Sequence, residues 1–176
     1  MTDPPAPELD PAALLGAFVR HGVKFVAVGG FAALLHGAQR TTKDVDLCVE
    51  WSSQNLERVA AALVELHAQL KVGIYIEVPI DATLLRRMEV ATWRTLGGDV
   101  DVLIGIPRSE RWDLARYDEL RDRGDVVEVG HLQIAIAGLD DIIRSKEIAD
   151  RSADHEALPE LRRLRDHRDL PPPSAA

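Results

Sequence analysis

Along residues 44–49, Asp-Val-Asp-Leu-Cys-Val, every second side chain is Val or Leu. Successive side chains of a strand point to opposite faces, so this segment predicts a strand with two chemically different faces. Asp44 and Asp46 share one face and lie about 6.6 Å apart along it. Their carboxylates can therefore converge on the same ions.

A third acid is available in Asp99-Val100-Asp101, which lies inside another apolar run. Carboxylate oxygens suit Mg²⁺ or Mn²⁺. Two such ions roughly 3.5–4 Å apart hold the attacking and leaving oxygens of a displacement at phosphorus. The acids therefore predict a metal-dependent phosphoryl-transfer site, with a solvated acidic strand face as the alternative.

A Gly29-Gly30 pair ends the apolar run that precedes the acidic strand. Backbone amides without side chains can approach phosphate oxygens closely. The polar loop that follows, residues 38–43, adds Arg40 and Thr42. The combination favours phosphate binding over a bare Gly-Gly turn.

The remaining pattern predicts helices and strands in one domain. Helices are expected over residues 10–22, 31–36, 52–69, 81–88, 112–123, 139–149 and 157–166. Strands are expected over residues 23–28, 44–49, 90–96 and 99–106, and as two short strands within 126–137. We expect a hairpin at Gly97-Gly98 and a second turn at Gly130-His131.

Composition limits the class of protein. With 176 residues, 46% hydrophobic and 28% charged, the chain predicts a single domain over residues 10–168, with disordered tails at 1–9 and 169–176. No apolar stretch approaches the roughly 20 residues of a membrane span, and no signal peptide is evident, so we expect a cytoplasmic protein without a membrane partner. The net charge of −8 argues against indiscriminate nucleic-acid binding but allows a local basic groove.

Three other side chains have both functional and structural interpretations. Cys48 is the one cysteine, which excludes an intramolecular disulfide, and a small buried hydrophobe is favoured over a reactive thiol. His36 is expected to pack at a helix end. Lys146 belongs to an apolar helical stripe with Leu139 and Ile143, so it should face inward and need a partner. That partner is either a phosphate or active-site carboxylate, or the ammonium reaches the protein edge by snorkelling.

The stretch 28–47 reads Val-Gly-Gly-Phe-Ala-Ala-Leu-Leu-His-Gly-Ala-Gln-Arg-Thr-Thr-Lys-Asp-Val-Asp-Leu. It resembles the signature of the nucleotidyltransferase superfamily that includes DNA polymerase beta, closest to the bacterial branch of abortive-infection type toxin nucleotidyltransferases. The resemblance continues in residues 95–103 and in residues 139–154, where members carry a helix with Lys, Arg and Asp. It implies an α/β (α+β) fold with a mixed β-sheet, flanking helices and a helical C-terminal part.

The resemblance also implies roles for individual residues. Gly29 and Gly30 would contact the nucleotide phosphates, with Arg40, Thr42 and Lys146 also at the nucleotide. Asp44 and Asp46 would hold the metal. Asp101 would be the third metal ligand or the base for the incoming hydroxyl, and Asp99 is the competing choice.

Together these patterns predict a Mg²⁺- or Mn²⁺-dependent enzyme that transfers NMP from an NTP to a hydroxyl and releases pyrophosphate. Its relatives suggest a tRNA 3′ end or a protein side chain as acceptor, in a toxin–antitoxin system. The alternatives are a nucleotidylylating antitoxin that modifies its cognate toxin, and a degenerate nucleotide-binding or toxin-binding module without turnover.

Overall fold

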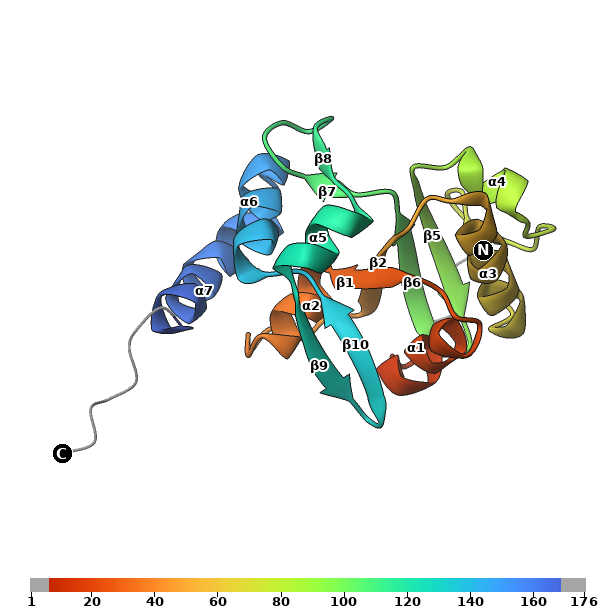
Figure 1. Cartoon of the computed structure of the whole chain (residues 1–176), viewed down its shortest axis with the longest axis horizontal. Helices are drawn as coiled ribbons and strands as arrows, with labels where there is room; N and C mark the ends of the chain where they lie inside the picture. Colours follow the sequence, from red (N-terminus) through yellow and green to blue (C-terminus); the bar gives the residue numbers. More distant parts are fainter. Residues whose placement is uncertain (1–6, 169–176) are drawn as a thin grey trace.

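The computed structural model describes residues 7–168. It shows a mixed sheet flanked by helices (Figure 1). The strands are β1 (Phe25–Val28), β2 (Asp44–Val49), β3 (Gln69–Lys71), β4 (Tyr75–Ile76), β5 (Val90–Thr95), β6 (Gly98–Leu103), β7 (Ile106–Pro107), β8 (Leu114–Ala115), β9 (Asp125–Val129) and β10 (Leu132–Ile136). The helices are α1 (Pro11–Arg20), α2 (Gly29–Leu35), α3 (Ser53–Glu65), α4 (Ala82–Arg86), α5 (Tyr117–Arg123), α6 (Leu139–Ala149) and α7 (Ser152–Arg168). The predicted fold class is confirmed.

Eight strands form one sheet in the order β4-β3-β5-β6-β2-β1-β10-β9. The pairs β2–β6 and β1–β10 are parallel, and the other neighbours are antiparallel. The strands β7 and β8 form a separate hairpin. In Figure 1, α6 and α7 lie at the opposite end of the molecule from α3 and α4.

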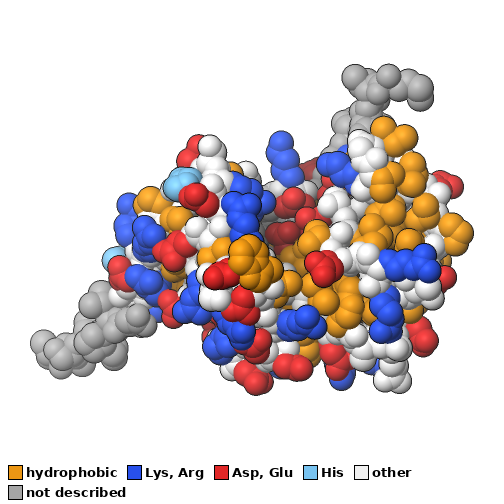
Figure 2. Space-filling model, turned by 90° about the horizontal axis from the view of Figure 1, so that it is seen from above, with side chains coloured by type: hydrophobic (Ala, Val, Ile, Leu, Met, Phe, Trp, Pro, Cys, Tyr) orange, Lys and Arg blue, Asp and Glu red, His pale blue; other side chains and the backbone are white. Residues whose placement is uncertain are grey.

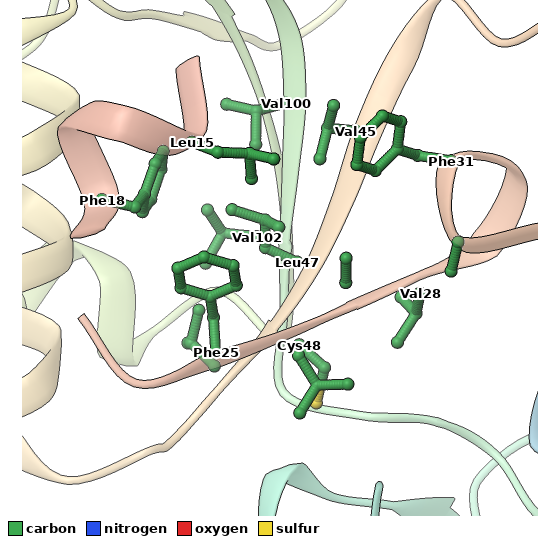
Figure 3. Close-up of a cluster of buried hydrophobic side chains, with 14 of the residues drawn as sticks. Leu15, Phe18, Phe25, Val28, Phe31, Val45, Leu47, Cys48, Val100 and Val102 are labelled. Carbon is green, nitrogen blue, oxygen red and sulfur yellow. The ribbon is translucent and has the colours of Figure 1, made fainter. Parts of the chain in front are cut away.

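The hydrophobic core lies on the apolar face of β2 and β6. Leu47 and Val100 are fully buried there, and Figure 3 shows them beside Leu15 and Phe18 of α1. The two-faced alternation of β2 therefore places its valines and leucine in the core. Its aspartates face away from that core.

Side-chain caps fix where three helices begin. The Asp10 carboxylate accepts from the Ala13 N–H at 3.0 Å, and Pro11 occupies the first turn of α1. Ser52 caps α3 and Asp81 caps α4 in the same way. These caps satisfy amides that have no partner within the helix.

Three predicted elements were placed or bounded wrongly. The helix expected over residues 112–123 begins only at Tyr117, because Leu114 and Ala115 pair with β7. The strand expected over 99–106 ends at Leu103, after which β7 forms its own pair. The last helix begins at Ser152 rather than at residue 157, and β3 and β4 were not predicted.

The predicted tails lie mostly outside the described residues, since residues 1–6 and 169–176 are not among them. Leu9, at the end of the predicted N-terminal tail, is partly buried against the core. Within residues 7–168, no helix is both long enough and apolar enough to cross a bilayer.

Candidate active site

Four acids meet where β2 and β6 run side by side. Their parallel register pairs Asp44 with Asp99 and Asp46 with Asp101. Because each pair of acids is two residues apart on its strand, all four project from the face opposite the core. The prediction that acids from two neighbouring strands share one face is confirmed.

The Gly29-Gly30 turn lies directly beside Asp46, because β1 pairs Val28 with Asp46. Gly29 has a φ of +62°, and a Cβ at this position would lie 2.1 Å from Asp46 Oδ2. The Gly30 N–H donates a hydrogen bond to the Asp46 carboxylate. Only glycine at position 29 allows this close approach.

Among residues 7–168, Asp44, Asp46 and Asp101 form no direct ion pair, whereas Asp99 pairs with Arg94. Burial raises the pKa of Asp46 to about 7, with further increases from Asp101 and Asp44, whereas Lys146 opposes them. Burial also raises the pKa of Asp101, and a hydrogen bond from Thr92 opposes that rise. Asp101 Oδ1 is a buried oxygen without a hydrogen-bond partner. The cluster therefore favours a bound cation or a bound proton.

The chemistry of Asp44, Asp46 and Asp101 fits a divalent cation, since all three offer carboxylate oxygens and their charges repel one another. Within residues 7–168, no three His, Cys, Asp or Glu side chains are already arranged around a common metal position. The acids thus match a hard cation in donor type and charge, while their present spacing does not form a coordination shell.

A cleft of about 560 Å³ opens above the acids. Five predicted site residues line it: Gly29, Gly30, Asp46, Asp101 and Lys146. Figure 2 looks onto the end of the molecule where β7 and β8 lie and shows a hollow with acidic side chains inside. A cleft of this volume is in the range of small-molecule sites.

Lys146 faces inward as its spacing predicted, and its direct partner is a carboxylate outside the acidic cluster. Its Nζ donates to Asp154 Oδ1 at 3.0 Å. Arg151 Nε donates to Asp154 Oδ2 at 2.8 Å, and the Asp154 side chain is only 2% exposed. This buried carboxylate fixes two cations, Lys146 and Arg151, that both line the cleft.

Arg40 and Thr42 line a side pocket of about 200 Å³, which shares Gly30 and Lys146 with the cleft. The Thr42 hydroxyl donates to Asp44 Oδ1 at 2.9 Å. Arg40 forms an exposed ion pair with Glu156 at 2.9 Å. Asp44 lines neither cavity and connects to the side pocket through Thr42.

The Thr42 hydroxyl lies close to the place where a side chain at position 30 would begin. A Cβ on Gly30 would lie 3.2 Å from Thr42 Oγ1. The loop therefore places a hydroxyl beside the glycine turn.

Both carboxylate oxygens of Asp99 accept hydrogen bonds from neighbouring side chains. Tyr75 donates its hydroxyl hydrogen to Asp99 Oδ2 at 2.8 Å, and Arg94 Nε donates to Oδ1 at 3.2 Å. The Arg94 guanidinium also stacks 3.7 Å from the centre of the Tyr75 ring. Asp99 does not line the cleft, whereas Asp101 does.

Two residues of the cleft wall had no signal in the sequence. Arg111 lies in the β7–β8 loop, and Ser145 lies on α6 one residue before Lys146. A loop arginine and a helix serine have no periodicity that distinguishes them from surface residues. Arg151, which pairs with Asp154, also reaches the cleft.

Cys48 and His36 have structural surroundings. The Cys48 side chain is fully buried, and burial raises the pKa of its thiol to about 12. The His36 ring nitrogen Nε2 lies 2.7 Å from the Ala137 carbonyl oxygen, and burial lowers the pKa of the ring. Both residues are packed as predicted.

Comparison with known structures identifies the architecture. The lincosamide antibiotic adenylyltransferase LnuA, with lincomycin bound, gives a TM-score of 0.59 at 15% identity, over 89% of this chain and 99% of that chain. A nucleotidyltransferase structure from Thermotoga maritima gives 0.51 at 13% identity, over 92% and 97%. The chain has the nucleotidyltransferase fold.

A third structure, ANT(2″)-Ia in complex with adenylyl-2″-tobramycin, gives a TM-score of 0.50 at 14% identity, over 88% of this chain and 92% of that chain. Comparison with protein-family models and with curated protein sequences finds no match. At identities this low the likeness shows the fold, and the chemistry must be argued from the cleft.

Proposed function

We propose that the protein is a metal-dependent nucleotidyltransferase that moves NMP from an NTP to an acceptor hydroxyl. The observation that carries this proposal is the half-buried carboxylate cluster beside the Gly29-Gly30 turn, at the base of a cleft with two fixed cations. The nucleotidyltransferase fold supports it. A solvated acidic strand face would have neither the raised pKa values nor the enclosing cleft.

In the proposed reaction, the acceptor oxygen forms a bond to the α-phosphorus of the NTP. The bond from that phosphorus to the bridging oxygen breaks, and pyrophosphate leaves with the electron pair. The acceptor proton passes to a base, for which Asp101 is the candidate because its Oδ1 is unpartnered. The products are the nucleotidylated acceptor and pyrophosphate.

Different residues of the cleft bind the triphosphate and the metal ion in the proposed reaction. The Gly29-Gly30 backbone and Lys146 hold the triphosphate, whose distal end extends toward Arg40 and Thr42 in the side pocket. Asp44 and Asp46 hold Mg²⁺ or Mn²⁺, with Asp101 as a third ligand if it is not the base. When bound, the ion would neutralise part of the negative charge of the phosphates.

The acceptor and the biological setting are extensions of this proposal. The sequence resemblance supports a tRNA 3′ end or a protein side chain in a toxin–antitoxin system. The names of two structural neighbours refer to antibiotics, lincomycin and tobramycin. A panel of acceptors must therefore include RNA, protein and small hydroxyl compounds.

A labelling experiment tests the proposal. The protein is incubated with each α-³²P-labelled NTP and Mg²⁺, separately with total tRNA, cell lysate, lincomycin and tobramycin. We expect one acceptor to gain label with release of pyrophosphate, and Asp46→Asn to abolish it. NTP binding without label transfer or pyrophosphate release in any arm would instead identify a binding module.

A further inference from the structure

Part of the cleft wall is apolar and comes from Val90 of β5, Leu103 of β6, and Ile106 and Pro107 of β7. Val90 is 58% exposed although it pairs with Leu103 inside the sheet. None of these four residues is among those assigned to the NTP, which leaves an apolar wall for a second ligand.

The loop that joins β7 to β8 also contributes to the wall of the cleft. Arg111 lines the cleft, and its guanidinium donates to the Ala149 carbonyl oxygen at 3.2 Å. Among residues 7–168, no carboxylate forms an ion pair with Arg111. Its positive charge is therefore available to an anionic ligand.

Trp112, the next residue, is 79% exposed on the same loop. Ion pairs brace the loop at its base: the Arg108 guanidinium donates to Asp113 Oδ1 at 2.7 Å and to Glu119 at 2.7 Å. The Arg108 N–H also donates to the Asp113 carbonyl oxygen at 2.8 Å. A large aromatic side chain thus stays in water on a braced loop. Trp112 itself does not line the cleft, but its neighbour Arg111 does, so a ligand held at Arg111 can extend to the indole.

We propose that the β7–β8 hairpin recognises the acceptor, and that the acceptor carries a planar ring and an anionic group near its reactive hydroxyl. This inference rests on the proposed transferase function. The attacking and leaving oxygens of phosphoryl transfer lie roughly in line. With the triphosphate tail directed toward Gly30 and the side pocket, the acceptor would reach the α-phosphate from the part of the cleft lined by Arg111 and the apolar wall, none of which lines the side pocket.

The chemistry of the hairpin selects this class of acceptor. Arg111 pairs with the anionic group, and the apolar wall and the Trp112 indole contact the ring. Stacking on an aromatic side chain is strong for nucleobases and other planar rings. An acceptor with these two features is a nucleotide, either free or at the end of a strand.

Calorimetry on the full-length protein tests this inference with simple probes. The donor site is first saturated with α,β-methylene ATP and Mg²⁺, and AMP, adenosine or ribose 5-phosphate is then titrated. We expect AMP to bind about tenfold more tightly than adenosine, which lacks the anion, and than ribose 5-phosphate, which lacks the ring. A trinucleotide that ends in adenosine distinguishes a strand end from a free nucleotide by which of the two binds more tightly.

Two variants and a control locate the effect. Arg111→Gln should weaken AMP binding about tenfold and leave adenosine unchanged, whereas Trp112→Ala should weaken both about fivefold. Arg121→Gln, an exposed arginine on α5, should change neither. Both functional variants should bind the ATP analogue as wild type does, because neither Arg111 nor Trp112 is among the residues assigned to the NTP.

The outcomes separate this inference from the proposed function. If the ATP analogue binds but AMP does not, or if Arg111→Gln binds AMP as wild type does, the hairpin is not the recognition element while the transferase proposal stands. If the ATP analogue itself fails to bind, both proposals are wrong.

Discussion

Asp46 links the charge of the acidic cluster to the stability of the free protein. Its pKa rises from 3.8 to about 7 in the folded state. Between about pH 4 and pH 7 the unfolded chain has lost this proton while the folded protein still binds it. Without metal, the contribution of Asp46 to stability is therefore present below pH 4 and is lost as the pH rises through 7.

Asp46→Asn should remove this pH dependence. Without metal, we expect the variant to match wild type near pH 4 and to exceed it at pH 8 by on the order of 2–4 kcal/mol in the free energy of unfolding. Urea denaturation across this pH range measures the difference. Asp122→Asn, an exposed acid on α5, is the control. A pH profile that is the same in Asp46→Asn and wild type would show that neither burial nor the neighbouring acids raise the pKa of Asp46.

Asp101 and Asp99 should differ in function although they lie two residues apart on one strand. Asp101→Asn should lose transfer by about 100-fold or more while keeping most NTP affinity, because it removes the candidate base. Asp99→Asn should lose little activity but lower the melting temperature, because Tyr75 and Arg94 lose a charged partner. Single-turnover rates and thermal melts measure both, and a larger rate loss at Asp99 would reverse the assignment.

At the scale of elements, the interface between α6 and α7 positions the two cations of the cleft, Lys146 and Arg151. Three ion pairs connect these helices: Lys146–Asp154 at 3.0 Å, exposed Glu147–Arg162 at 2.6 Å and Asp140–Arg165 at 3.8 Å. The first two offer a matched comparison, since both cross the same interface and only Lys146–Asp154 borders the cleft.

Lys146→Met should weaken NTP binding by on the order of 1.5–3 kcal/mol through loss of a charge-assisted contact. It should also destabilise the free protein, because Asp154 keeps only Arg151 as a charged partner. Arg162→Met should change stability by about 0–1 kcal/mol and leave NTP affinity unchanged. Thermal melts with and without NTP and Mg²⁺ test both, and an equal ligand-induced shift in Lys146→Met and wild type would remove Lys146 from the site.

Local sequence patterns predicted the elements whose signals are local. The cap at Asp10 and the two-faced alternation of β2 each depend on neighbouring residues, and both are present in the fold. The predicted helix wrongly included Leu114 and Ala115. These two residues pair with Pro107 and Ile106, and hydrophobic periodicity within one segment cannot predict pairing between two segments. The two-residue strand β4 is too short to show a period at all.

At the scale of the whole molecule, the proposed ligands should stabilise the native state. Mg²⁺ with the preferred NTP at about 100 times its dissociation constant should add about 2.7 kcal/mol, which corresponds to roughly 5–10 °C in melting temperature. EDTA should cancel most of this shift, and the shift should grow between pH 6 and pH 8 because metal binding requires an ionised Asp46. A shift that EDTA leaves intact would argue against a metal-assisted site.

The sequence predicted the parts of the site that belong to one strand or one turn, and not the contacts between distant segments. The parity of β2 identified Asp44 and Asp46, helical periodicity predicted that Lys146 faces inward, and the resemblance pointed to Asp101 and Lys146 as site residues. The partnership of Lys146 with buried Asp154 depends on how α7 folds back on α6, and the place of Arg111 depends on the β7–β8 hairpin. No local pattern in the chain specifies either of these contacts.

The parallel pairing of β2 with β6 also determines when the site comes into existence. Asp46 and Asp101 are 55 positions apart (101 − 46), and the pairing of Ala27 with Ile136 spans 109 positions (136 − 27). Contacts between such distant segments form late in folding, and Lys146 follows all of them in the chain. A chain still emerging from the ribosome therefore has its glycine turn and first two acids but no complete cleft, so the proposed transfer reaction requires nearly the whole domain to have been synthesised.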